Sequence, residues 1–156
     1  MEAIVADPEA LRFTRIPEPP PPSFARQWLE RYEEGRRDGS REAFAAIDDD
    51  DGFLGLALAP EFDREAAEVE LGYIVLPQAR GRGVATAMLR ALARWAFEQG
   101  AQRATRIIGV DNAASARVAE RCGYVTRGRD AIGLPQGRTA ERRRPVVAAA
   151  VGPVAD

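Results

Sequence analysis

Residues 71–86 have the sequence Leu71-Gly72-Tyr73-Ile74-Val75-Leu76-Pro77-Gln78-Ala79-Arg80-Gly81-Arg82-Gly83-Val84-Ala85-Thr86. The apolar segment that ends at Leu76 predicts a strand, because Pro77 stops strand pairing. The amphipathic segment from Val84 to Gln99 predicts a helix that ends at Gly100. A strand that passes through a tight glycine turn into a helix presents free backbone N–H groups and a partial positive charge. That arrangement is a binding site for a pyrophosphate.

The turn itself has the composition that such a site requires. Gly81, Gly83 and Ala85 are small enough for the backbone to approach phosphate oxygens, and Arg80 and Arg82 add positive charge. The patterns G-x-x-x-x-G-K-[ST] and G-x-G-x-x-G are both absent. Their absence argues against a nucleoside triphosphate and against NAD as the ligand.

Outside this stretch, the sequence alternates between helical and strand patterns. A helix is predicted at 24–38, after the N-cap Ser23, and a shorter one at 113–121, after the N-cap Asn112. Further strands are predicted at 43–47, 53–59, 68–76 and 106–110, with a final one at 146–151. Prolines between 17 and 22 predict a stiff connector, and Asp48–Gly52 predicts a hairpin turn in preference to a calcium loop. The order indicates an α/β (α+β) domain with a mixed central sheet flanked by helices.

Composition limits the chemistry. The 156 residues fit one domain, residues 1–156. There is no histidine and no lysine, so a histidine base, a Ser–His triad and a Schiff-base lysine are excluded, and with the single Cys122 we expect no metal site. No apolar run is long enough to cross a bilayer and the start of the chain does not resemble a signal peptide, so we expect a cytoplasmic protein without a membrane or nucleic-acid partner.

Charge is divided unevenly along the chain. Residues 1–70 hold 18 acidic and eight basic residues, whereas residues 71–156 hold six acidic and 14 basic ones. A basic second half suits a phosphate-bearing ligand, and an acidic first half suits a cationic acceptor.

Two motifs in succession resemble the GNAT superfamily of N-acetyltransferases. The segment Arg80-x-x-Gly83-x-Ala85 after an apolar strand is similar to that family's [RQ]-x-x-G-x-[GA] pattern. The segment Asn112-x-x-Ser115-x-Arg117-Val118-x-Glu120-x-x-Gly123-Tyr124 is similar to the next segment of the family in its Rim-type branch, the ribosomal-protein alanine N-acetyltransferases and their relatives. The resemblance covers about residues 7–137 and is best over 68–124.

The resemblance implies acetyl-CoA as co-substrate and a cofactor cradle at 68–124. Tyr73, Ile74 and Val75 would line the pantetheine arm through backbone hydrogen bonds, and Asn112 would contact the cofactor or an ordered water. The pyrophosphate would lie on Arg80, Gly81, Arg82, Gly83, Val84, Ala85 and Thr86. The structural alternatives are a helix cap for Asn112 and a tight packing turn for the glycines.

The resemblance also implies transfer of an acetyl group to a primary amine, on a protein N-terminus or a small molecule. With no histidine, the base must be a carboxylate or a water that a carboxylate orders. Glu70 matches the glutamate before Gly-Tyr in the Rim-type pattern, and Glu68 shares its strand face as an alternative. Ser115 matches the Rim-type serine that could pass a proton to the leaving thiolate, and capping a helix is its alternative role. The base and acid pair of other family members falls on Ile107 and Ala119 here, so that pair is missing.

Both ends of the chain depart from the family pattern. The usual first strand has no counterpart before residue 24, and the run Arg142-Arg143-Arg144-Pro145 replaces the usual entry to a paired strand, in an atypical tail at 138–156. An open sheet edge predicts a homodimer. The same departures leave open a non-catalytic acyl-CoA-binding module as the alternative function.

Overall fold

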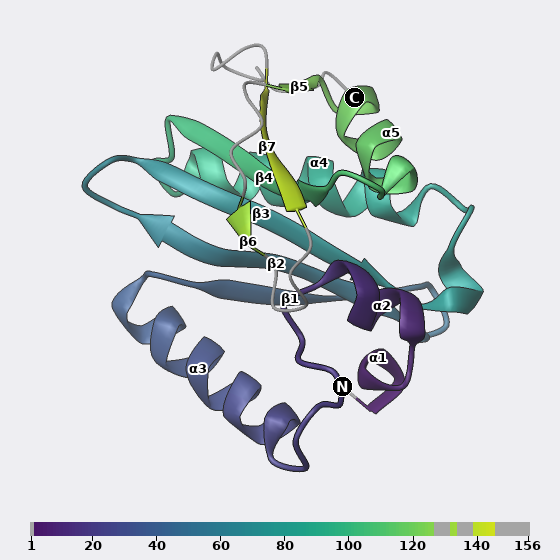
Figure 1. The fold of residues 1–156 in the computed structure, drawn as a ribbon. Helices are drawn as coiled ribbons and strands as arrows, with labels where there is room; N and C mark the ends of the chain where they lie inside the picture. Colours follow the sequence, from purple (N-terminus) through teal and green to yellow (C-terminus); the bar gives the residue numbers. More distant parts are fainter. Residues whose placement is uncertain (1, 127–131, 134–138, 146–156) are drawn as a thin grey trace.

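A mixed sheet with helices on both faces forms the protein, as Figure 1 shows. The computed structural model describes residues 2–126, 132–133 and 139–145. The helices are α1 (Glu2–Val5), α2 (Pro8–Phe13), α3 (Phe24–Asp38), α4 (Val84–Glu98) and α5 (Ala113–Arg121), with a 3-10 turn η1 (Pro77–Ala79). The strands are β1 (Glu42–Ile47), β2 (Phe53–Asp63), β3 (Glu68–Val75), β4 (Arg103–Gly109), β5 (Tyr124–Thr126), β6 (Ile132–Gly133) and β7 (Thr139–Pro145).

The strand order β1-β2-β3-β4-β7-β5, with β6 beside β7, confirms the predicted mixed sheet flanked by helices. All neighbours are antiparallel except β3 and β4. These two strands pair in parallel only at their beginnings, Glu68–Glu70 with Arg103–Thr105. Beyond those residues the strands separate, which opens the sheet between them.

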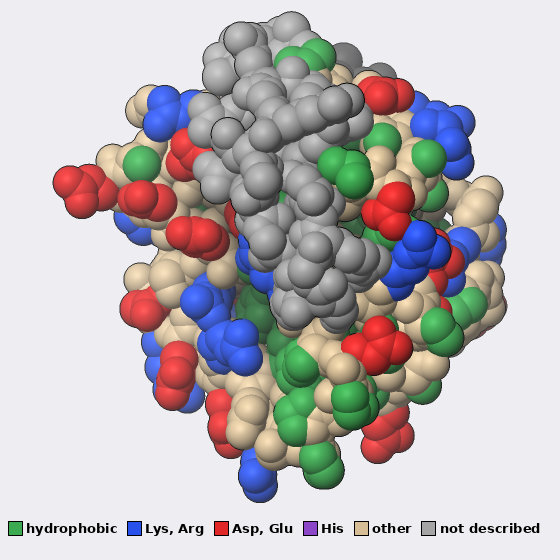
Figure 2. All heavy atoms as spheres, viewed as in Figure 1, with side chains coloured by type: hydrophobic (Ala, Val, Ile, Leu, Met, Phe, Trp, Pro, Cys, Tyr) green, Lys and Arg blue, Asp and Glu red, His purple; other side chains and the backbone are tan. Residues whose placement is uncertain are grey.

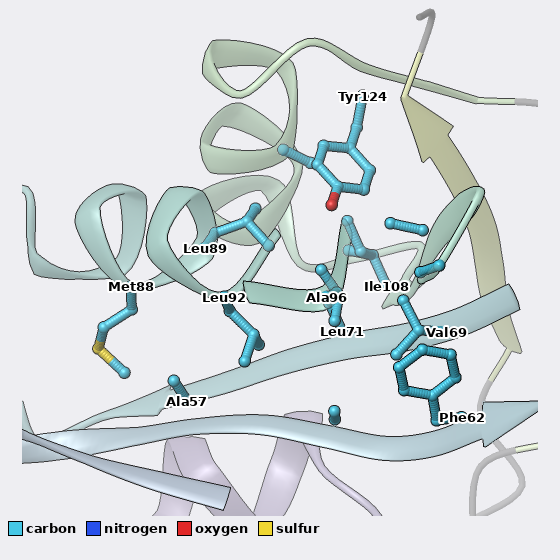
Figure 3. Packing of buried hydrophobic residues seen from close by; sticks show 14 of the residues in the cluster. Ala57, Phe62, Val69, Leu71, Met88, Leu89, Leu92, Ala96, Ile108 and Tyr124 are labelled. Atoms are coloured by element: carbon cyan, nitrogen blue, oxygen red, sulfur yellow. The ribbon is translucent and has the colours of Figure 1, made fainter. Parts of the chain in front are cut away.

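The two faces of the sheet carry separate apolar cores. On one face, Val69 and Leu71 of β3 belong to the same apolar cluster as Leu89 and Leu92 of α4, and Figure 3 shows these side chains together with Tyr124. On the other face, the core consists of Ile4, Ala10, Leu11, Ile16, Phe24, Tyr32, Leu58, Ile74 and Leu76, which joins α1, α2 and α3 to β2 and β3. Full burial of one leucine or isoleucine contributes about 1.5–3 kcal/mol, so both helix layers are firmly held to the sheet.

Most predicted elements are present with small shifts in their bounds. The helices at 24–38 and 113–121 are confirmed, the long helix ends at Glu98, and β2 extends four residues past the predicted Ala59. The Asp48 side chain accepts hydrogen bonds from the N–H groups of Asp50 and Gly52, which confirms the hairpin turn. Ser23 precedes α3, but its side chain makes no capping hydrogen bond.

Two helices at the start of the chain were missed. Asp7 caps α2 by accepting from the Glu9 N–H at 3.1 Å, and Pro8 occupies the first helical position. Asp-Pro-Glu is a helix start signal, and it was overlooked because both helices are short. In residues 2–41 the structure describes helices and no strand.

The expectation for the arginine run was wrong. Arg142, Arg143 and Arg144 lie within β7, which pairs with β4 on one side and with β5 on the other. The run therefore belongs to the sheet and does not interrupt it. The predicted strand at 146–151 lies outside the described residues. In the described part of the chain no helix has the length and apolar character needed to cross a membrane.

Candidate active site

A cavity of about 500 Å³ occupies the opening between β3 and β4. Residues from both faces of the sheet line it, including Val84 and Val118 from one side and Trp28 and Tyr32 from the other. Ligand sites in proteins have volumes of about 300–1,000 Å³. The cavity therefore connects the helix layer of α4 and α5 with the layer of α1 to α3 through the sheet.

The N-terminus of α4 forms one end of this cavity. Gly81 and Gly83 have φ angles of 74° and 80°, in the left-handed region that favours glycine. No side chain caps α4, whereas Asn112 caps α5 by accepting from the Ser115 N–H at 2.9 Å. A Cβ atom at Gly81 or Gly83 would meet no atom within 4 Å, so the space above the turn is open. The free N–H groups of the first turn of α4 thus face a space that suits an anion.

The two arginines of this turn differ from what the sequence indicated. Arg80 lines the cavity, but its guanidinium binds Asp7 and Glu9 and donates from Nε to the Val75 carbonyl at 3.1 Å. Arg82 is exposed and lies outside the cavity lining. Arg80 therefore holds the N-terminal helices against the turn, and the backbone of the turn is left as the main anion-binding group.

Three polar side chains meet in the middle of the cavity. The Tyr73 hydroxyl lies 3.1 Å from Ser115 Oγ, and Arg106 Nη2 donates to the same oxygen at 3.2 Å. Tyr73 comes from β3, Arg106 from β4 and Ser115 from α5, so the network spans the separated strands. The structure thus brings together two predicted site residues, Tyr73 and Ser115, with a third that was not predicted.

Arg106 was missed by the sequence analysis. Its side chain is buried, donates from Nη1 to the Leu71 carbonyl at 3.3 Å, and lies over the Tyr73 ring at 4.3 Å. Burial lowers the pKa of the guanidinium, and no described residue hydrogen-bonds its Nε. The sequence did contain a signal for this residue. Arg106 lies two positions from Ala104 and two from Ile108 along β4, so its side chain shares their buried face.

Glu70 lies toward the other end of the cavity. Its side chain is 14% exposed, and Arg15 Nη2 donates to Glu70 Oε2 at 2.9 Å. No described residue hydrogen-bonds its Oε1. Glu68 has the same orientation on β3, but it forms an ion pair with Arg103 and does not line the cavity. The structure thus separates the two candidate bases, since only Glu70 faces the cavity.

Aromatic and basic side chains form the wall around Glu70. Phe24, Trp28 and Tyr32 come from one face of α3, and the Trp28 and Tyr32 rings lie 4.2 Å apart. Arg31 and Arg41 complete this wall. Burial raises the pKa of Tyr32 to about 12, an effect that Arg41 opposes, so this hydroxyl stays protonated near neutral pH. Figure 2 shows one face of the molecule, with basic and hydrophobic side chains next to each other on its lower part.

Helical spacing predicts that Leu29 shares the apolar face of α3. In the structure Leu29 is 50% exposed and lies outside the cavity lining. Within the described residues, no group of three or more acidic or cysteine side chains is arranged to hold a metal ion.

The mixed sheet, opened between β3 and β4 and flanked by helices, is the fold of the GNAT acetyltransferases. The chain belongs to the acetyltransferase (GNAT) domain family, whose model matches residues 1–125. Its structure is similar to that of the spermidine N-acetyltransferase from Vibrio cholerae in complex with CoA and spermine, with a TM-score of 0.76, 19% identity and coverage of 90% of this chain and 84% of that one. A chimera of the Vibrio cholerae enzyme with hSSAT gives a TM-score of 0.70 at 18% identity, covering 81% and 79% of the two chains. No curated protein matches the sequence.

Proposed function

We propose that the protein transfers an acetyl group from acetyl-CoA to a primary amine. The observation that carries this proposal is one continuous cavity. It reaches from the uncapped N-terminus of α4, between the separated strands β3 and β4, to the Glu70 carboxylate. A cofactor that lies between β3 and β4 can present its acyl end to an acceptor that enters from the α3 side.

The residues present fit the cofactor that the family uses. The N–H groups of Gly83, Val84, Ala85 and Thr86 would hold the pyrophosphate, with Gly81 providing the turn. The backbone of Tyr73, Ile74 and Val75 borders the opening, where it can hydrogen-bond the pantetheine arm. Asn112 also lines the cavity, but its side-chain oxygen already caps α5. Acetyl-CoA would supply the activated acetyl thioester.

Glu70 is the proposed base. Its Oε1 atom accepts the proton that the attacking nitrogen must lose, directly or through a water, while Arg15 holds Oε2. The nitrogen then bonds to the acetyl carbon as the carbon–sulfur bond breaks. Ser115 delivers a proton to the departing thiolate and takes one from Tyr73 across the 3.1 Å contact. Solvent then returns a proton to Tyr73 and accepts the proton held by Glu70. Arg106 fixes the position of Ser115 Oγ.

Further features of this proposal are a Rim-type relationship, a cytoplasmic location, a single domain over residues 1–156 and a homodimer. The Rim-type relationship is supported by Ser115, which takes part in the polar network of the cavity. Location in a reducing compartment is supported by the single Cys122, which has no cysteine to pair with in the chain. The dimer is supported by β1, which lies at the edge of the described sheet.

The experiment that tests the function has two parts. Thermal unfolding with acetyl-CoA at about 100 times its dissociation constant should show about 2.7 kcal/mol of added stability, and NADH should show little. Release of the CoA thiol should then depend on an added amine. Saturable binding without thiol release for any amine would favour the alternative, a non-catalytic acyl-CoA-binding module.

A further inference from the structure

Some of the arginines near the acceptor end of the cavity form an ion pair with a carboxylate, and others do not. Five arginines lie between residues 24 and 41. Arg26, Arg36 and Arg37 form ion pairs with Glu30, Glu42 and Glu33. Among the described residues, Arg31 and Arg41 have no carboxylate within ion-pair distance, and these two line the cavity. The arginines without a carboxylate partner are therefore the ones that face the proposed acceptor.

Among the described residues that line the cavity, basic side chains outnumber acidic ones. Its described lining contains six arginines and two glutamates. Both glutamates are already paired, Glu70 with Arg15 and Glu9 with Arg80. Arg31 is exposed and Arg41 is half-buried, so both residues keep part of their surface accessible. A polyamine would bring several positive charges to a wall that already has an excess of them, and like charges repel.

Charged and apolar side chains line the acceptor end of the cavity together. Arg15, Arg31, Arg41 and Glu70 border the cavity with Tyr32. Phe24, Trp28 and Leu58 give the same wall an apolar surface. A ligand that fits must therefore offer an anionic group to the guanidinium groups and an apolar group to the aromatic rings.

We infer that the acceptor is a small amine that also carries a carboxylate and an apolar side group, as an apolar amino acid does. This inference rests on the proposed acetyl transfer and names its substrate class. The carboxylate would bind Arg31 and Arg41, whose planar guanidinium groups match the geometry of a carboxylate. The amine would then lie toward Glu70. The excess of acidic residues in the first half of the sequence favoured a cationic acceptor. In the structure, however, most of these acidic residues lie outside the cavity.

The test compares L-phenylalanine, L-phenylalaninamide and spermidine as acceptors. The amide retains the amine and the ring but lacks the carboxylate. Its amine is also less basic, so a larger fraction is neutral and reactive, which biases the comparison against our inference. We expect kcat/KM for the acid to exceed that for the amide by about 10–100-fold, the effect of one or two charge-assisted hydrogen bonds.

Arg31→Gln and Arg41→Gln should each raise KM for L-phenylalanine by about tenfold or more and leave KM for the amide unchanged. Arg37→Gln is the matched control, because Arg37 lies on α3, as Arg31 does, but outside the cavity. An unchanged thermal shift with acetyl-CoA shows that each variant is folded. Equal use of acid and amide, or a preference for spermidine, overturns the inference while the proposed function stands.

Absence of turnover with every acceptor would instead overturn the proposed function. In that case calorimetric titration of the CoA-saturated protein decides the inference. Binding of L-phenylalanine that exceeds binding of the amide supports it, and equal or absent binding of the acid overturns it.

Discussion

The hydroxyl groups of Tyr73 and Ser115 lie 3.1 Å apart, although 42 positions separate the two residues in the chain. Tyr73 is on β3 and Ser115 is in the first turn of α5, on the opposite side of the opening between β3 and β4. Asn112 fixes the start of α5 by accepting from the Ser115 N–H. The contact is therefore held by the fold and does not depend on a ligand.

Replacement of Ser115 by alanine should lower kcat by roughly 10²-fold, because a positioned proton donor typically contributes 10²–10⁴-fold. The Ser115 N–H remains, so the cap on α5 and the affinity for acetyl-CoA should not change. Thiol-release kinetics and calorimetry with acetyl-CoA measure the two quantities. Ser23→Ala, outside the cavity, serves as the control, and a Ser115→Ala enzyme with parental kcat would remove Ser115 from the mechanism.

Glu70→Gln should reduce turnover by roughly 10²–10⁴-fold without weakening acetyl-CoA binding, because the amide cannot accept the proton. Glu68→Gln is a close control, since Glu68 lies two residues earlier on the same strand face but outside the cavity. We expect the Glu68 variant to retain parental turnover. Similar losses in both variants would show that the effect comes from the strand and not from a base.

Gly83→Val should abolish the thermal shift with acetyl-CoA. Its φ of 80° strains any side chain, and the valine would occupy the open space above the turn. Gly100→Val is the matched control, because Gly100 has a φ of 92° and open space around it but follows the opposite end of α4. Both variants should lose stability by about 1 kcal/mol or more, and only the first should lose the ligand effect. A retained shift in Gly83→Val would place the cofactor elsewhere.

Most residues at the cofactor end of the cavity could be predicted from the sequence, but few of those at the acceptor end could. The glycine turn and the Asn112 cap are local features, so short motifs were sufficient to predict them. The contacts of Arg106 depend on how β3, β4 and α5 meet, and the wall made by Arg31, Tyr32 and Arg41 depends on how α3 lies against the sheet. Helical spacing predicts an apolar face on α3, but it does not distinguish a side chain buried in a core from one that borders a cavity.

The role of Arg80 could not be predicted for a similar reason. Its ion pairs join residues more than 70 positions apart, through a helix that was not predicted. Arg80 matches the family motif in sequence, yet its charge is neutralised by Asp7 and Glu9 from the start of the chain.

Tyr124→Phe should not destabilise the protein at neutral pH and should raise its stability by about 1 kcal/mol. The Tyr124 hydroxyl is buried in the core that Figure 3 shows, and no described residue hydrogen-bonds it. Removal of an unsatisfied buried hydroxyl recovers its desolvation cost. Denaturant unfolding at pH 7 measures the difference, and a loss above 1 kcal/mol would indicate an additional partner.

The same variant should reduce the alkaline loss of stability. Burial raises the pKa of Tyr124 to about 12, whereas an unfolded tyrosine ionises near pH 10. Between pH 10 and 12 the unfolded state therefore binds fewer protons, and the free energy of unfolding falls by up to about 1.4 kcal/mol per pH unit for this residue. Tyr32 adds a similar slope, so Tyr124→Phe should remove about half of the combined slope. A slope equal to that of the parent would contradict the assignment.

The last prediction is that the protein forms a homodimer through the edge strand β1. In the described sheet β1 pairs with β2 on one side, and no described strand pairs with its other side. Ile47 and Phe44 on this strand are 58% and 39% exposed, and an apolar edge strand tends to pair with another chain. Ile47→Lys should therefore shift the mass measured by light scattering from twice 17.0 kDa toward 17.0 kDa at micromolar concentration. Leu29→Lys, an equally apolar site that is 50% exposed on α3, should leave the mass unchanged. A parental mass of 17.0 kDa that holds across dilution rules out the dimer.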